Sequence, residues 1–230
     1  MIVLAIQGVP GSMKSTTIQK VKSMSNAEIK IAGWTERVEH FEDVRGLFNP
    51  LKEFYDSGNL SAEERELRAV RMQLVALSDM VSRCWQAYTT AVEDGCHVLL
   101  LERDIDSWMI FARAQLEEGI ISEKTYQSME LLHESIVPHV VSPDLTVLLD
   151  VDAAVAKQRI ESRGRESEKA ITLDYLDTLA FVHRARLRSN VVCLNCDTSD
   201  LAAALLYNII TVQLTDGGTE NLPPPDSVRL

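Results

Sequence analysis

The chain has 230 residues, an apolar fraction of 46% and a formal net charge of −11, values that suit one sizeable α/β core. The acidic charge argues against a nucleic-acid polymer or an anionic membrane as a partner, so a site for a polyanion must gather its few cations locally. Because no apolar run approaches the ~20 residues of a membrane span and the N-terminus lacks the basic start of a signal peptide, we expect a cytoplasmic protein.

The first segment predicts a phosphate-binding loop. Apolar residues 2–6 indicate a buried strand, and the stretch after them runs through glycines into Lys14 and Ser15, where we expect a helix that ends near Ser23. In such a loop the backbone N–H groups surround phosphate oxygens, the lysine reaches the β- and γ-phosphates and the serine hydroxyl binds Mg²⁺. The predicted phosphate-binding residues are Gly8, Gly11, Ser12, Met13, Lys14, Ser15 and Thr16.

Met13 departs from the usual pattern, which has glycine directly before the lysine. Glycine is used there because the backbone needs φ > 0 or a close approach. We therefore expect Met13 either to adopt a helical conformation or to reshape the loop slightly. An ordinary glycine-containing turn between a strand and a helix is the alternative interpretation of this segment.

Strands and helices alternate along the rest of the chain. Further strands are expected at residues 29–34, 97–101 and 145–150 and at Val191, and helices at 62–90, 108–118, 122–137, 153–162, 173–188 and 201–214. Ser61 and Glu64 have the spacing of a capping box at the start of the long helix. The alternation predicts one domain over residues 1–214, with a parallel sheet flanked by helices, and the proline-rich residues 215–230 predict a disordered tail.

The four cysteines are too few and too scattered for a disulfide framework. Cys193 and Cys196 form one CxxC, which would need a second ligand pair to bind zinc, and none is evident. We therefore expect these two thiols to be buried or half-buried at a late strand.

Charged residues follow two of the predicted strands. Glu36 comes just after the second strand, and Glu102 and Arg103 directly follow the apolar run of the third. The carboxyl ends of parallel strands meet at the edge of the sheet where open α/β folds bind ligands. We therefore expect these side chains in a ligand crevice, with a simple ion pair as the alternative interpretation of Glu102 and Arg103.

Three arginines cluster late in this acidic chain. Arg159 and Arg163 are four residues apart and share one face of the predicted helix, and Arg165 follows Gly164. Such a cluster is suited to close over a polyphosphate as an arginine-rich lid and to stabilise a phosphoryl group during transfer. A surface run of charges paired with nearby glutamates is the alternative.

Taken together, these motifs resemble the deoxyribonucleoside kinase family, which includes deoxycytidine, deoxyguanosine and thymidine-2 kinases and viral thymidine kinases. The resemblance covers roughly residues 1–200 and departs from the family at Met13, at Arg37 where proline is usual, and at Asp104 where serine is usual. The matching segments are 8–17, 35–41, 49–55, 102–104, the arginines at 159, 163 and 165, and 174–179.

The resemblance implies a P-loop kinase fold that transfers the γ-phosphoryl group of ATP to the 5′-hydroxyl of a deoxynucleoside, with Mg²⁺. Glu36 would be the general base, and Arg103 would keep that carboxylate ionised and steer the phosphoryl group, alongside the catalytic Lys14. Ser15 and Glu102 would bind Mg²⁺. A homodimer through the long helices is also implied.

The resemblance also implies where the nucleoside binds. Tyr55 and Glu168 match positions that hydrogen-bond the sugar 3′-hydroxyl, and Gln73 matches the glutamine that reads the edge of the base. Phe41 would flank the base and Phe111 would stack on it, unless either is a plain core side chain.

Trp108 stands where the family has a small or acidic residue. A side chain of this size in the pocket would exclude bulky purines, so we expect a pyrimidine nucleoside, thymidine ahead of deoxycytidine. Two other functions stay open. A thymidylate kinase shares the phosphate loop and the arginine lid, and a P-loop protein that binds nucleotides without catalysis is suggested by Met13 and Asp104.

Overall fold

The computed structural model describes residues 1–36, 49–56, 60–185 and 190–215. Within these residues, five parallel strands form one sheet in the order β2-β3-β1-β4-β5. The strands are β1 Ile2–Gln7, β2 Ile31–Trp34, β3 Val98–Glu102, β4 Leu145–Leu149 and β5 Val191–Leu194. The strand order reverses next to β1, where such folds bind their ligands.

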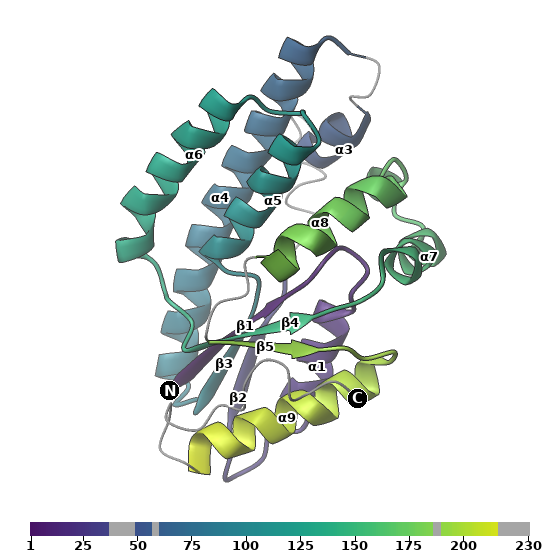
Figure 1. Ribbon diagram of the computed structural model, residues 1–230. Coiled ribbons are helices and arrows are strands. Elements are labelled where there is room, and N and C mark those ends of the chain that lie inside the picture. Colours follow the sequence, from purple (N-terminus) through teal and green to yellow (C-terminus); the bar gives the residue numbers. More distant parts are fainter. Residues whose placement is uncertain (37–48, 57–59, 186–189, 216–230) are drawn as a thin grey trace.

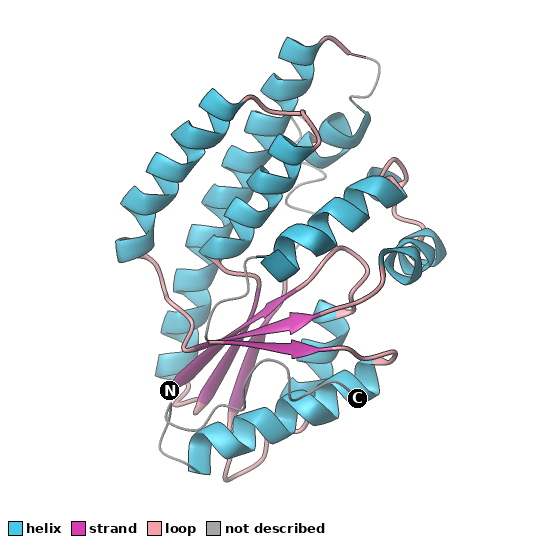
Figure 2. Cartoon of the chain, viewed as in Figure 1, coloured by secondary structure: helices cyan, strands magenta, loops and turns pink. Residues whose placement is uncertain are grey.

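Helices cover both faces of the sheet (Figures 1 and 2). One face carries α1 and α9, which pack against each other, and the other face carries α4, α5 and α8. The helices are α1 Lys14–Ser23, α3 Pro50–Tyr55, α4 Ala62–Glu93, α5 Ile105–Glu117, α6 Glu123–Ile136, α7 Ala153–Arg163, α8 Leu173–Ala185 and α9 Ser199–Thr215, with short 3₁₀ turns η2 Val137–His139 and η3 Glu166–Glu168.

Alternate strand residues build two separate cores. Leu4 and Leu100 pack with α1 and α9, whereas Val3, Leu99 and Leu101 pack with α4 and α5. Successive side chains of a strand point to opposite faces, so a sheet that is covered on both sides needs a continuous apolar run. This explains why these strands were visible in the sequence.

The predicted α/β class, the parallel sheet and the flanking helices are confirmed. The main error concerns α5, which begins at Ile105 and not at Trp108, because the Asp104 side chain caps it by accepting a bond from the backbone N–H of Ser107 at 3.0 Å. The continuation of α8 past Ala185 and the predicted tail after Thr215 lie outside the described residues. Cys193 is half-buried and Cys196 is buried, as predicted.

No helix among the described residues combines the length and the apolar character needed to cross a membrane.

Candidate active site

The loop between β1 and α1 depends on two glycines. Gly8 and Gly11 have φ values of 143° and 85°. A Cβ atom on Gly8 would lie 2.7 Å from the carbonyl oxygen of Leu149, and one on Gly11 would lie 2.5 Å from that of Ala156. Both positions therefore require glycine for conformation and for space.

Met13 adopts the left-handed helical conformation, with φ 66° and ψ 18°. The helical conformation expected for Met13 from the sequence is therefore wrong, because Met13 keeps the positive φ that glycine usually supplies at this position. A non-glycine residue pays about 1–2 kcal/mol for this conformation. The first turn of α1 has no side-chain cap, so its N–H groups face the loop and can bind an anion.

The Lys14 ammonium lies inside the loop. Its Nζ atom donates to the carbonyl oxygens of Gly8 and Val9, each at 3.0 Å, and the residue is buried. Burial, together with the nearby Arg103 charge, lowers the pKa of Lys14 to about 7. A phosphate anion at this point would favour the charged form of the amine.

Ser15 and Glu102 form a pair of oxygen ligands beside the loop. The Ser15 hydroxyl donates to Glu102 Oε2 at 2.8 Å, and the backbone N–H of Glu36 donates to the same oxygen at 3.0 Å. The described residues contain no group of three or more His, Cys, Asp or Glu side chains that could hold a metal. Mg²⁺ binds one or two protein oxygens and takes its other ligands from phosphate and water, so the Ser15 hydroxyl and the Glu102 carboxylate could hold it.

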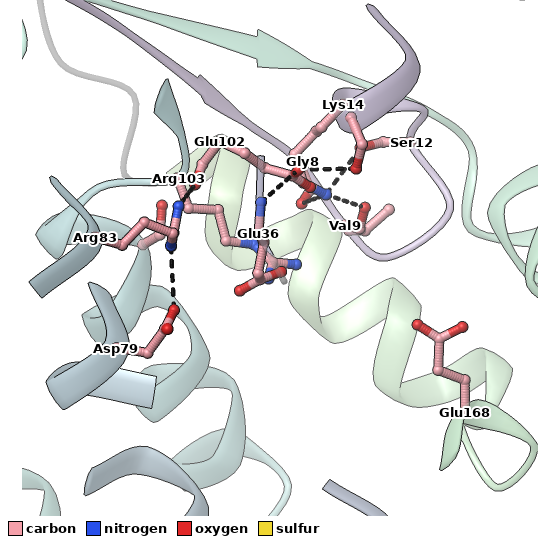
Figure 3. A network of polar contacts seen from close by, with 12 residues as sticks. Gly8, Val9, Ser12, Lys14, Glu36, Asp79, Arg83, Glu102, Arg103 and Glu168 are labelled. Atoms are coloured by element: carbon pink, nitrogen blue, oxygen red, sulfur yellow. Dashed lines mark hydrogen bonds and ion pairs between the residues drawn. The ribbon is translucent and has the colours of Figure 1, made fainter. Parts of the chain in front are cut away.

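Glu36 and Arg103 form a largely buried ion pair next to these ligands (Figure 3). Burial raises the pKa of Glu36, but the charges of Arg103, Arg83 and Lys14 outweigh it, and the net pKa lies below its usual value. Burial lowers the pKa of Arg103, but the negative charges of Glu36 and Glu102 raise it by more. The net pKa of Arg103 therefore lies above its usual value. Glu36 is therefore an ionised carboxylate at neutral pH.

A pocket of about 280 Å³ opens between the phosphate loop, α4, α5 and the turn after α7. It joins most of the residues that the sequence predicted to act together. The predicted residues in its lining are Gly11, Met13, Lys14, Ser15, Thr16, Glu36, Tyr55, Gln73, Glu102, Arg103, Phe111, Arg163, Arg165 and Glu168. Gly8 and Ser12 support the loop behind this lining, and Phe41 lies outside the described residues.

The lid arginines meet the predicted sugar-binding residues. Glu168 is buried, and its Oε2 atom accepts a bond from Arg163 at 2.5 Å, while Oε1 lies 3.5 Å from Arg165. Tyr55 lines the same pocket, and burial raises its pKa, so its hydroxyl stays protonated. One cluster thus links the predicted lid to the predicted sugar site.

A family model described as deoxynucleoside kinase matches residues 4–221. The chain belongs to the deoxynucleoside kinase family. It is 27% identical over 183 residues to mitochondrial thymidine kinase 2 of Homo sapiens, an alignment that covers 79% of this chain and 62% of that protein. It is 32% identical over 92 residues to deoxyguanosine kinase of Dictyostelium discoideum, covering 40% of this chain and 31% of that protein. Both alignments span less than two thirds of the relative.

A solved structure with this fold is deoxyadenosine kinase from M. mycoides with bound dATP. The two share a TM-score of 0.71 at 18% identity, over 92% of this chain and 100% of that one. At this level of identity the likeness supports the P-loop kinase fold of the deoxynucleoside kinase family and nothing beyond the fold.

In this member of the family, the two aromatic residues Trp108 and Phe111 of α5 make different contacts. The guanidinium carbon of Arg103 lies 4.7 Å above the ring of Phe111, so one face of that ring holds the side chain that pairs with Glu36. Trp108 is almost completely buried, and its indole N–H donates to the backbone carbonyl of Gln73 at 2.9 Å. Trp108 thus supports the segment of α4 that carries Gln73 and also reaches the pocket lining.

Arg159 lies apart from the other two lid arginines. It lines a second hollow of about 190 Å³ and donates to the carbonyl oxygen of Asp197 at 2.8 Å. Its other contact is with the carbonyl oxygen of Gly11 in the phosphate loop, at 3.5 Å. The three arginines that were predicted as one group therefore line two different hollows.

Sequence reasoning missed several residues of the site; among them, Met80, Gln115 and Tyr175 line the pocket and Arg83 lies behind it. Met80 follows Gln73 by two helical turns, so helical spacing could have found it. The others depend on how α4, α5 and α8 pack together, which no local pattern encodes.

Proposed function

We propose that this protein is a deoxynucleoside kinase that transfers the γ-phosphoryl group of ATP to the 5′-hydroxyl of a deoxynucleoside. The observation that carries the proposal is the Glu36–Arg103 pair, which lines one pocket with Lys14 of the phosphate loop and with Gln73. An ionised base, a phosphate-binding lysine and an amide that can read a base edge are the parts that such a transfer needs.

In the proposed reaction, a bond forms between the 5′-oxygen and the γ-phosphorus, and the bond from that phosphorus to the oxygen bridging to the β-phosphorus breaks, releasing ADP. Glu36 positions the hydroxyl and accepts its proton late, since the transition state is loose. A positioned base of this kind contributes about 10²- to 10⁴-fold. Arg103 and Lys14 stabilise the charge on the phosphoryl oxygens.

Ser15 and Glu102 would hold Mg²⁺, which when bound neutralises phosphate charge. Arg163 and Arg165 would contact the polyphosphate from the lid. We place the remainder of ATP beyond the loop, along the hollow lined by Arg159, because that arginine touches both Gly11 and Asp197.

We propose a pyrimidine base, with thymidine preferred over deoxycytidine. The Gln73 amide offers a donor and an acceptor together, and so can pair with either pyrimidine. The bulk of Trp108 and of Met80 in the lining leaves less room for a purine. The relatives named above act on different bases, so this preference depends on these side chains alone.

We also propose a homodimer, which would bury an apolar strip of α4. Leu67, Leu74 and Trp85 on this helix are 54%, 50% and 47% exposed, a large amount for apolar side chains. Light scattering on the purified protein should give twice the monomer mass, and a monomer at micromolar concentration would contradict the proposal.

A steady-state screen of the four deoxynucleosides and of thymidine monophosphate, with ATP and Mg²⁺, tests the proposed function. We expect turnover of nucleosides, highest with thymidine. Turnover of the monophosphate alone would identify a nucleotide kinase instead. ATP binding without any turnover would identify a non-catalytic binding protein.

A further inference from the structure

A buried arginine lies behind the reactive groups, outside the pocket lining. Arg83 of α4 is 4% exposed, and its Nη1 atom donates to the backbone carbonyl oxygen of Glu102 at 3.0 Å. Its Nε atom donates to Asp79 Oδ2 at 3.1 Å, one helical turn earlier. Figure 3 shows Arg83 between Asp79 and the turn at Glu102 and Arg103.

Burying this charge is costly. Removing an ion from water costs several kcal/mol even when it is paired. One further donor of Arg83, Nη2, is buried without a hydrogen-bond partner in the described part of the chain. A buried ion pair such as Arg83–Asp79 adds little net stability compared with apolar side chains. Stability therefore does not explain why Arg83 is buried, and its hydrogen bond to the Glu102 carbonyl oxygen suggests another reason.

The turn that Arg83 contacts is strained. Arg103 has φ 65°, in the left-handed region that is unfavourable for residues other than glycine. The angle φ of Arg103 is set by the orientation of the peptide plane that joins it to Glu102. The N–H of this peptide donates to Ile6 on β1 at 3.0 Å, and its C=O accepts from Arg83 on α4. The plane is therefore held at both ends.

The strained turn has a direct consequence for the site. In an extended strand, adjacent side chains point to opposite faces of the sheet. Here Glu102 and Arg103 are adjacent, yet both line the same pocket, where Glu102 meets Ser15 and Arg103 meets Glu36. The left-handed conformation at Arg103 brings the two side chains to one side.

We propose that Arg83, oriented by Asp79, is a positioning residue for phosphoryl transfer: it holds the Glu102–Arg103 peptide so that both side chains face the reacting groups. Its catalytic consequence rests on the proposed function, whereas its structural consequence does not. Because Gln73, Tyr55 and Glu168 bind the nucleoside without this turn, Arg83 should affect kcat far more than KM.

The test uses Arg83→Met, which keeps the length and apolar stem of the side chain and removes its donors. We expect kcat to fall about 10- to 100-fold, as for a small misplacement of catalytic groups, with KM for the nucleoside within about threefold of the wild-type value. The matched control is Arg113→Met, which breaks an exposed pair of the same spacing with Glu117 and should leave kcat within about twofold. Unchanged kcat in a folded Arg83→Met protein would overturn the proposal.

A double-mutant cycle separates positioning from general destabilisation. If Arg83 acts through Arg103, Arg83→Met should cost less than about threefold in an Arg103→Gln background. If the fold losses in kcat of the two single variants multiply in the double variant, Arg83 acts independently of the turn. If Arg83→Met does not fold, Asp79→Asn is the milder variant, and the same cycle with Arg103→Gln applies.

A crystal structure of Arg83→Met, or of Asp79→Asn in that case, distinguishes failure of this proposal from failure of the proposed function. We expect residue 103 to leave the left-handed region and its guanidinium to separate from Glu36. Retention of φ near its present value with the ion pair intact would overturn the positioning role, whatever reaction the wild-type protein catalyses.

Discussion

Glu36 and Arg103 lie on the side of the pocket that we propose binds the acceptor hydroxyl, here called the acceptor side, and their charged groups are buried at strand ends. Arg163 and Arg165 lie on the lid side, and their charged groups are half exposed beyond α7. The side chains of Arg103 and Glu36 are 11% and 15% exposed, while those of Arg163 and Arg165 are both 37% exposed. Arg103 is held by a strained turn, an ion pair and an aromatic ring, but Arg163 and Arg165 share one partner, Glu168.

The difference is consistent with the roles proposed for the two sides. Buried and multiply held groups are preorganised, so they suit the hydroxyl that must be aligned to within a fraction of an ångström. Half-exposed arginines can exchange Glu168 for phosphate oxygens with little desolvation cost, so they suit a polyphosphate that must enter and leave.

The largest expected effect is on the acceptor side. Glu36→Gln keeps the shape of the side chain but cannot accept the hydroxyl proton, so we expect kcat to fall about 10²- to 10⁴-fold, with a smaller change in KM. Steady-state kinetics with the preferred nucleoside measure this. Glu64→Gln, which breaks an exposed pair with Arg68 on α4, is the control and should leave kcat unchanged.

The lid should respond differently. Arg163→Met removes the proposed contact with the polyphosphate, so we expect kcat/KM for ATP to fall about 10- to 100-fold while KM for the nucleoside changes less. Lys169→Met, which breaks the exposed pair with Glu166, is the matched control. If the nucleoside KM rose as much as the ATP KM, the proposed division between the two sides would fail.

His183 of α8 is a buried titratable residue. Burial, with the charges of Lys14 and Arg103, lowers its pKa from 6.5 to about 3. As pH falls through 6.5 the unfolded chain takes up a proton that the native state does not accept until about pH 3, so stability is lost across that window. The slope from this residue is at most about 1.4 kcal/mol per pH unit.

We therefore expect His183→Gln to flatten the loss of stability between pH 6 and pH 4. The number of protons taken up on unfolding in this range should fall by close to one. Denaturant unfolding at several pH values measures the slope. His139→Gln, at an exposed position, is the control for loss of a histidine. An unchanged slope in His183→Gln would show that His183 is not shielded from water in the native protein.

The smallest expected effect is at Met13. Met13→Gly relieves the left-handed strain but adds freedom to the unfolded chain, so we expect a net gain of about 0.5–1 kcal/mol in the free energy of unfolding. Met24→Gly is the matched control, because Met24 flanks the other end of α1 with φ −84° and should lose stability. A loss in both variants would show that Met13 is held by its side chain.

The sequence predicted the parts of the site that depend on residues close together in the chain. The phosphate loop is a contiguous motif, and Glu36, Glu102 and Arg103 directly follow apolar strands, so the parallel-sheet rule was sufficient to bring them together. The capping role of Asp104 moved the start of α5, because an N-cap and a strand end look alike in sequence.

Other features depended on packing between distant elements. The separation of Arg159 from Arg163 depends on the approach of Asp197, more than thirty residues later, and the role proposed for Arg83 depends on a strained peptide in another element. A left-handed arginine has no signature in the sequence, since most residues that adopt this conformation are glycines. Such contacts emerge only when the helices are placed over the sheet.

The most direct test of the account follows ³¹P resonances of ATP mixed with the four deoxynucleosides, for the wild-type protein and for Glu36→Gln. We predict that wild-type protein produces ADP and a nucleoside 5′-monophosphate in equal amounts, and that the variant produces neither at a comparable rate. Equal rates for the two proteins, or phosphate transfer only when nucleoside monophosphates replace the nucleosides, would contradict the role assigned to the buried carboxylate.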